Sequence, residues 1–214
     1  MQTYKTQKQL QAALETLSAS DKKLAAAFQE YGTPPMRPLA EGFIGLTRIL
    51  ISQQVSTAAA ATIQARFEAL LDEDDEAHAP HALLALPEED VRACGISRAK
   101  QSYMRHLAEA VVSGALNVAA LRKADNQTVY DQLTAIKGIG PWTAQCYLLF
   151  SLRRADMFPA GDLALQQAVR IMYGMEARPE AAELTAFAAR WAPHRGAAAR
   201  LLWTYYNGEQ AKNR

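Results

Sequence analysis

Apolar residues recur three and four positions apart along most of the chain, with polar residues between them. The first two segments show the spacing, in Leu10, Leu14 and Leu17 and then in Leu24, Phe28 and Tyr31. Such spacing places the apolar side chains on one face of an α-helix, whereas a half-buried strand needs strict alternation. The pattern predicts an all-α protein.

Glycine, proline and small capping residues divide this pattern into separate helices. Gly32 ends the second segment, and a third, marked by Phe43 and Leu46, stops near Ser52. Ser56 is a helix-capping residue type and begins the next segment. Further on, a helix beginning at residue 125 or 126 is expected to run to Gly138, and Pro141 opens another. Three more helical segments follow, divided at residues 159–162, 174–179 and 193–196.

Composition narrows the class of protein. Half of the residues are hydrophobic, but no run approaches the roughly 20 apolar residues that cross a bilayer, and residues 1–8 are polar. We therefore expect a soluble, intracellular protein that does not enter a membrane. Cys94 and Cys146 are the two cysteines, too few for a disulfide framework or a four-cysteine metal cluster.

The net charge of +1 conceals an uneven distribution. Residues 72–76 are all acidic, and without them 17 acids stand against 23 bases. A basic face that binds nucleic acid is therefore compatible with the composition. The acidic run itself is expected to be a solvated loop.

Residues 136–144 join two predicted helices through a turn in which Gly138 and Gly140 flank Ile139. Glycines permit positive φ and close approach, so backbone N–H groups of the turn and of the helix after Pro141 can point at a phosphate. Ile139 is expected to pack between the two helices. The side chains of Lys137 and Thr143 are candidate phosphate contacts. An ordinary glycine turn between helices remains the alternative.

This segment resembles the helix-hairpin-helix of DNA-binding proteins. With Trp142, Thr143 and Ala144 it is similar to the version found in the 3-methyladenine DNA glycosylases of the helix-hairpin-helix glycosylase superfamily. The resemblance covers approximately residues 35–210 and implies two helical lobes with a DNA-binding cleft. The expected divisions are residues 1–34, which pack with the C-terminal lobe, a central lobe of residues 35–152, and a C-terminal lobe of residues 153–214.

The resemblance implies that Asp162 is the catalytic carboxylate. It stands 20 residues after Trp142, directly before an apolar helical pattern. Without the family, an aspartate at a helix start is most simply an N-cap. A carboxylate also suits the chemistry, because cleaving a glycosidic bond builds positive charge on the sugar. Asp156 is the nearest rival and lacks both the spacing and the helix start.

The polar break at residues 52–56 resembles the loop that relatives insert into the gap left by a flipped nucleotide. Gln53 or Gln54 would be the inserted side chain, with Ser56 beside it at the DNA. Some relatives place a leucine here, so this sequence departs from that version. A helix kink with solvated glutamines is the alternative.

Trp142 and Trp203 are implied to line the base pocket, where electron-rich rings favour purines made cationic by alkylation. Relatives that also cut the strand carry a lysine two residues after the second glycine; here that residue is Trp142, and Lys137 does not match it. The implied activity is monofunctional excision of 3-methyladenine or 7-methylguanine type bases from duplex DNA in base excision repair, leaving an abasic site.

The resemblance also bears on cofactors. No iron–sulfur cluster is expected, because the tail lacks its cysteines. Relatives bind Na⁺ or K⁺ through hairpin carbonyls that match Thr134, Ile136 and Ile139. A zinc site from His78, His81 and Cys94 is a less favoured alternative, because only the two histidines have ligand-like spacing.

The remaining expectations concern partners and alternatives. We expect a monomer acting in the bacterial cytoplasm or a eukaryotic nucleus. The main alternative function is a non-catalytic helix-hairpin-helix protein that senses damaged DNA; a bifunctional glycosylase for oxidised bases is the other.

Overall fold

The computed structural model describes residues 1–71 and 76–212. This part of the chain contains twelve α-helices and no strand, and its only β-type pairing is an isolated bridge between Thr3 and Arg154. The all-α prediction is confirmed. The chain forms two compact units, one of residues 1–38 with 152–214 and one of residues 39–151.

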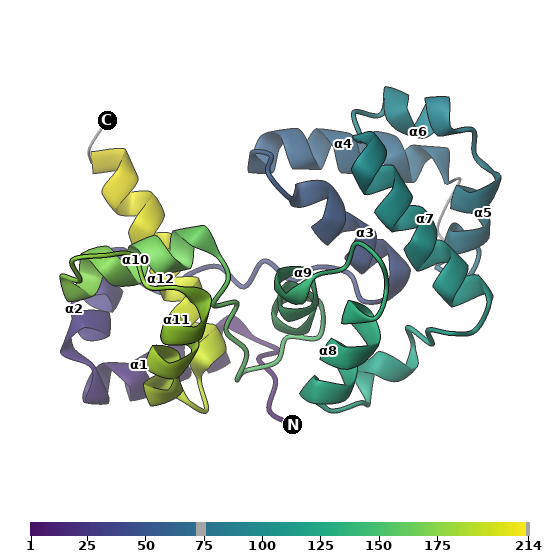
Figure 1. Cartoon of the computed structure of the whole chain (residues 1–214). Coiled ribbons are helices and arrows are strands. Elements are labelled where there is room, and N and C mark those ends of the chain that lie inside the picture. The colour runs from purple at the N-terminus through teal and green to yellow at the C-terminus, as the bar shows by residue number, and fades with distance from the viewer. Residues whose placement is uncertain (72–75, 213–214) are drawn as a thin grey trace. The chain divides into compact units, whose positions relative to one another are not determined.

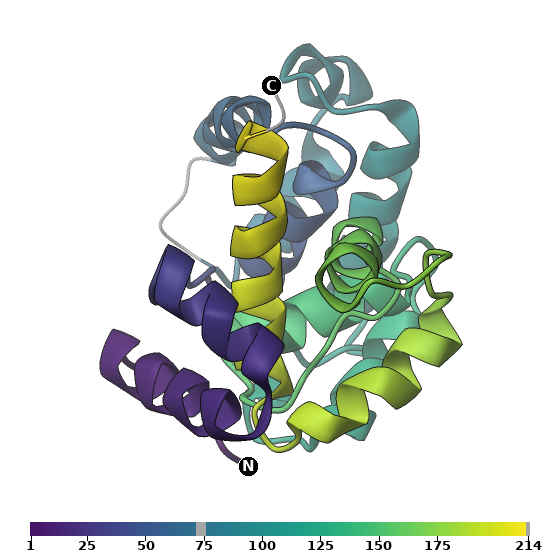
Figure 2. The same ribbon diagram turned by 90° about the vertical axis from the view of Figure 1, so that its left-hand side faces the viewer.

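The first unit joins the two ends of the chain. Its main packing pairs are α10 with α12, α1 with α2, and α12 with α2 and α1. Figure 2 shows the two N-terminal helices beside the long C-terminal helix. The helices are α1 (Gln7–Ser20), α2 (Lys22–Tyr31), α10 (Leu163–Tyr173), α11 (Ala181–Ala188), the 3₁₀ helix η3 (Ala189–Trp191) and α12 (Arg195–Lys212).

A polar cluster fixes α2 within this unit. Asp21 is the N-cap of α2, accepting from the backbone N–H groups of Lys23 and Leu24. Its other oxygen accepts from the Tyr173 hydroxyl at 2.6 Å and the Trp191 indole at 3.0 Å. Burial raises the pKa of Asp21, but these hydrogen bonds outweigh it and the net pKa lies below the usual value.

The second unit holds the middle of the chain. Figure 1 shows α7 beside α3 and α5, and the helices pack in those pairs. Its helices are α3 (Gly42–Ser52), α4 (Thr57–Leu70), α5 (Ala79–Ala85), α6 (Glu88–Ala93), α7 (Arg98–Val112), η1 (Ala120–Arg122), α8 (Asn126–Thr134), α9 (Pro141–Cys146) and the π-helix η2 (Tyr147–Ser151).

One helix boundary and one whole helix differ from the sequence prediction. α8 ends at Thr134 rather than at Gly138, because Ile136 N donates to Leu133 O, an i→i−3 bond that tightens the chain into the hairpin. The seven-residue α5 was not predicted, since it has only about two turns to display a period.

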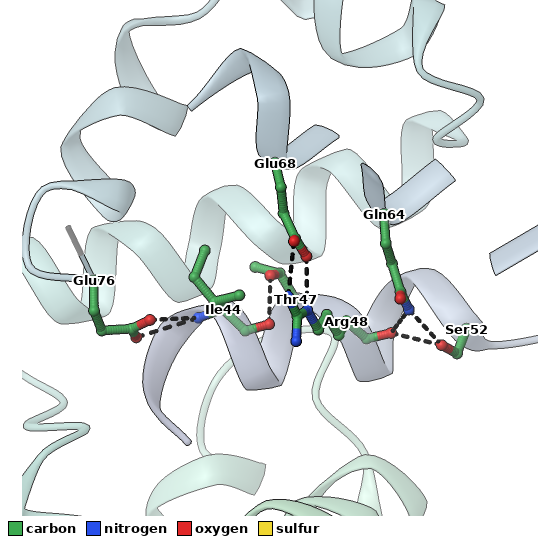
Figure 3. A network of polar contacts seen from close by, with 7 residues as sticks. All are labelled: Ile44, Thr47, Arg48, Ser52, Gln64, Glu68 and Glu76. Atoms are coloured by element: carbon green, nitrogen blue, oxygen red, sulfur yellow. Dashed lines mark hydrogen bonds and ion pairs between the residues drawn. The ribbon is translucent and has the colours of Figure 1, made fainter. Parts of the chain in front are cut away.

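Part of the acidic run also behaves differently from the expected solvated loop. Residues 72–75 lie outside the described residues, but the Glu76 carboxylate accepts from the backbone N–H groups of Phe43 and Ile44. Figure 3 shows the bonds to Ile44. The Glu76 carboxylate thus caps α3, whose own N-cap residue, Glu41, makes no such bond. Gly42 has φ +79° and lies against this carboxylate, so a side chain there would collide with it.

Candidate active site and DNA-binding elements

The candidate catalytic carboxylate lies in the first unit. Asp162 is the N-cap of α10: its Oδ1 accepts from Leu165 N at 3.0 Å. The same oxygen accepts from the indole Nε1 of Trp203, on α12, at 3.0 Å. Two helices therefore fix the orientation of this half-buried carboxylate, and the structure brings Asp162 and Trp203 together.

Asp156, the rival carboxylate, is engaged elsewhere. Its two oxygens accept from Nε and Nη2 of Arg195 at 2.7 and 2.9 Å. Burial raises the pKa of Asp156, but the hydrogen bond and charge of Arg195 more than offset it, leaving the pKa below the usual value. A bidentate pair of this kind fixes the start of α12 and occupies both oxygens.

An apolar side chain beside Asp162 is exposed. Leu163 is 62% exposed, whereas Leu165 and Val169, later in α10, are fully buried. As the first residue of α10 it points away from the core. A large exposed apolar side chain next to a carboxylate is a candidate contact for the sugar face of a nucleotide.

The hairpin lies in the second unit, and its two glycine positions differ in whether the fold needs glycine there. Gly138 has φ +95°, and a Cβ there would stand 2.1 Å from the Tyr103 ring. Gly140 has ordinary φ (−90°) and no neighbour within 4 Å of such a Cβ. The fold requires glycine at 138 but not at 140, where the open space suits a close external group.

The other hairpin residues differ in how far their side chains are buried. Ile139 is 3% exposed, as expected for a side chain that packs inside the turn. Lys137 is exposed and Trp142 is half-buried. Thr143 is 2% exposed and its hydroxyl accepts from Gln53 Nε2 at 2.9 Å. This burial argues against the predicted phosphate contact from the Thr143 side chain.

The polar break is a sharp turn between α3 and α4. Gln54 has φ +56°, in the left-handed region, and its side chain is exposed. Ser56 caps α4 by accepting from Ala59 N at 3.2 Å. Because the Gln53 amide is held by Thr143, Gln54 is the glutamine that extends from the turn. The alternative of a mere kink with two solvated glutamines does not describe Gln53.

Carbonyl oxygens suitable for a monovalent cation occur at the hairpin. Thr134 ends α8, where backbone carbonyls lack helical partners and the helix dipole is negative. The Ile136 carbonyl accepts from Ile139 N at 3.0 Å and can offer its second lone pair. The donor set fits Na⁺ or K⁺. Among the described residues, no group of three His, Cys, Asp or Glu side chains is placed to hold a metal ion, so the zinc alternative lacks its cluster.

Sequence reasoning missed one polar contact at the break. Lys100, in the first turn of α7, donates to the carbonyls of Ile51 and Gln53 at 2.7 and 2.6 Å. The residues are 47 or more positions apart, and no local pattern marks the contact. No helix in the described part of the chain has the length and apolar character needed to cross a membrane.

Comparison with known proteins agrees with this geometry. DNA-3-methyladenine glycosylase 1 of Schizosaccharomyces pombe is 31% identical over 89% of this chain and 83% of its own length. The putative DNA-3-methyladenine glycosylase YfjP of Bacillus subtilis is 27% identical over 91% of this chain and 68% of its own length.

Solved structures of 3-methyladenine DNA glycosylases are also similar to this chain. The S. pombe 3-methyladenine DNA glycosylase Mag1 in complex with abasic DNA superposes with a TM-score of 0.79 at 31% identity, covering 90% of this chain and 95% of that one. A DNA-3-methyladenine glycosidase from Bacillus halodurans gives 0.76 at 33% identity, with coverages of 94% and 91%. The model of the HhH-GPD superfamily base excision DNA repair proteins matches residues 47–194, which include the polar break, the hairpin and Asp162. The chain belongs to the HhH-GPD superfamily of base excision DNA repair proteins.

Proposed function

We propose that this protein is a monofunctional DNA glycosylase that excises alkylated purines of the 3-methyladenine and 7-methylguanine type from duplex DNA. The observation that carries the proposal is Asp162, a carboxylate held at the start of α10 by Leu165 N and by the Trp203 indole. It follows a glycine hairpin at the family's spacing. Relatives at about 30% identity are named for this activity.

The reaction needs little from the protein beyond placed charge. The bond between C1′ and the base nitrogen breaks, the base leaves with the electron pair, and water supplies the oxygen that bonds to C1′ and releases a proton. Asp162 stabilises the positive charge on the sugar or orients the water. A base made cationic by alkylation is already a good leaving group, so excision of the purine requires no metal-activated step in this scheme.

DNA is held through its phosphates and opened by a wedge. Backbone N–H groups of Gly138 and Gly140, with the start of α9, receive a phosphate, and Lys137 adds charge. Gln54 enters the stack where the damaged nucleotide has left. Ser56 lies in the same exposed turn.

A tryptophan beside Asp162 contributes to selecting the base. Trp203 offers a π-face to a flipped cationic purine, an attraction of roughly 0.5–2 kcal/mol, and the family resemblance assigns a base contact to Trp142 as well. Trp203 adds a second action, because its N–H orients Asp162. It lies beyond the range matched by the family model, so this action rests on the geometry rather than on the family match.

The remaining proposals concern the product and the setting. With Trp142 at the lyase-lysine position, the protein stops at the abasic site without cutting the strand. Na⁺ or K⁺ would bind to the backbone carbonyls of Thr134, Ile136 and Ile139 and make the hairpin more rigid. If so, Na⁺ or K⁺ should raise the unfolding midpoint more than a bulky organic cation does at equal ionic strength. The protein acts as a monomer on damaged duplex DNA, in the bacterial cytoplasm or a eukaryotic nucleus, without an iron–sulfur cluster.

The test is the release of free bases from methylated duplex DNA, with strand integrity examined before and after alkali. Methylpurine release with strands that break only after alkali supports the proposal. Strand breaks without alkali would indicate the bifunctional alternative. Tight binding to the same DNA with no base released would indicate the non-catalytic damage sensor.

A further inference from the structure

The turn between α3 and α4 is stabilised by a cation from another helix. Lys100 belongs to the first turn of α7, where a positive charge is mildly unfavourable for its own helix dipole. Its ammonium instead donates to Ile51 O and Gln53 O, at the C-terminal end of α3, where a cation is favourable. Burial lowers the pKa of Lys100 below its usual value, in keeping with an ammonium partly withdrawn from water.

These bonds fix the backbone on which Gln54 depends. Gln53 is extended (ψ +132°), and the next residue adopts φ +56°, a conformation that a non-glycine residue keeps only when its surroundings impose it. Holding the Gln53 carbonyl sets the orientation of the peptide plane that leads into Gln54. The side chain of Gln53 is held as well, through its amide on Thr143.

Side chains of α4 also stabilise the turn, through contacts with α3. Figure 3 shows Gln64, on α4, whose amide donates to Arg48 O at 3.1 Å and to Ser52 Oγ at 3.0 Å. In the same view Arg48 pairs with Glu68 through two bonds of 2.7 and 2.8 Å. α3 and α4 are therefore tied together up to Ser52, and the residues beyond it are held by Lys100 and Thr143.

We propose that Lys100 is a positioning residue for base flipping: through the carbonyls of Ile51 and Gln53 it holds the turn that presents Gln54 to the DNA. This rests on the proposed function, in which Gln54 fills the gap left by the damaged nucleotide. Lys100 touches neither the base nor Asp162 in this scheme. Its effect passes through Gln54.

The test is a double-mutant cycle between Lys100→Met and Gln54→Ala. The excision rate is measured at saturating enzyme on a duplex with one 7-methylguanine. Each single change should lower this rate about 10- to 100-fold, the scale expected when a contact is misplaced by about 1 Å. The double variant should be no slower than the slower single variant, because Lys100 acts through Gln54. Single losses that multiply in the double variant would overturn the proposal.

A second readout separates positioning from general stability. 2-Aminopurine placed opposite an abasic-site analogue reports insertion of the wedge by its fluorescence. Lys100→Met should lose the change that the wild type gives, and Lys100→Arg should restore part of it. The matched control is Lys123→Met, an exposed lysine of the same unit, which should behave as the wild type. A normal fluorescence change in Lys100→Met, whatever its unfolding midpoint, overturns the proposal.

Failure of the two proposals can be told apart. If the wild type releases no methylated base, the proposed function fails, while the fluorescence comparison still decides the role of Lys100. If Lys100→Met does not fold, Thr143→Val takes its place, since it removes the acceptor of the Gln53 amide. Thr143→Val should then show the same lack of additivity with Gln54→Ala, and multiplicative losses there would count against the coupled turn.

Discussion

Replacing Asp162 with asparagine removes a negative charge and leaves the local geometry nearly intact. The amide oxygen of asparagine can accept from both Leu165 N and Trp203 Nε1, the two donors that Oδ1 now receives at 3.0 Å. Asparagine is about as good an N-cap as aspartate. The substitution therefore separates the capping role of Asp162 from its proposed role in catalysis.

The expected magnitudes differ between stability and activity. Exchanging the charged acceptor of the Trp203 indole for a neutral one weakens that hydrogen bond, so the unfolding free energy should fall by about 1 kcal/mol. For a chain of this size that corresponds to about 2–4 °C in the unfolding midpoint. Losing one group that stabilises transition-state charge lowers a rate by about 10²- to 10³-fold. Activity should therefore collapse while most of the protein stays folded at 25 °C.

The assay is single-turnover release of 7-methylguanine, alongside binding to a duplex that carries an abasic-site analogue. Asp156→Asn is the matched control, because its carboxylate is similarly exposed but is engaged with Arg195. It should lose stability and keep most of the excision rate. An Asp162→Asn variant that retains more than a tenth of the wild-type rate, or that loses DNA binding in the same proportion, would refute the assignment of Asp162.

Four further substitutions test the fold and the hairpin. Gly138→Ala should destabilise the protein by more than about 1 kcal/mol because Gly138 has a positive φ. Gly140→Ala should leave the unfolding midpoint within about 1 °C of the wild type and weaken DNA binding. Equal unfolding midpoints of the two variants would contradict the conclusion that the fold needs glycine at 138 but not at 140. Asp21→Ala should cost about 2–4 kcal/mol, since it removes a cap and the acceptor of the Trp191 indole. The pKa of Asp21 is lower in the folded protein than in the unfolded chain, where it is about 3.9. The stabilisation that Asp21 gives is therefore present above pH 3.9 and is lost as the pH falls through the folded-state pKa. In a chemical-denaturation series from pH 7 to pH 2, the unfolding free energies of the wild type and Asp21→Ala should converge at the acid end. Glu76→Ala should cost about 0.5–2 kcal/mol by removing the side-chain cap of α3, measured by urea unfolding, and a neutral result would contradict that role.

The helical core was predictable because its information is local. Leu10, Leu14 and Leu17 are all within 4% exposed, as their period indicates. The end of α8 was misplaced for the opposite reason: Gly138 is a strong stop signal, but the turn also has to bury Ile139, and that requirement ends the helix four residues earlier. The exposure of Leu163 was not predictable, because period alone does not show which residue at a helix start faces away from the core.

The candidate residues divide in the same way. The hairpin and Asp162 could be proposed from the sequence because spacing along the chain marks them. Lys100 could not, since its partners Ile51 and Gln53 contribute only carbonyl oxygens, which every residue type possesses. Glu76 was likewise read as one acid of a charged run, because its partners are backbone N–H groups of α3. Hydrogen bonds from a side chain to a distant backbone group cannot be predicted from the residue types, because every residue has a backbone carbonyl.

In the proposed function, the structural and the catalytic role of Asp162 need not compete. A helix N-cap holds its carboxylate at a fixed place and orientation. An oxocarbenium-like sugar needs a carboxylate that is charged, fixed and already oriented before the bond breaks. Trp203 completes the constraint from α12, so the carboxylate is held from two helices of one compact unit. For this chemistry, the cap position is itself the means by which the fold prepares the catalytic group.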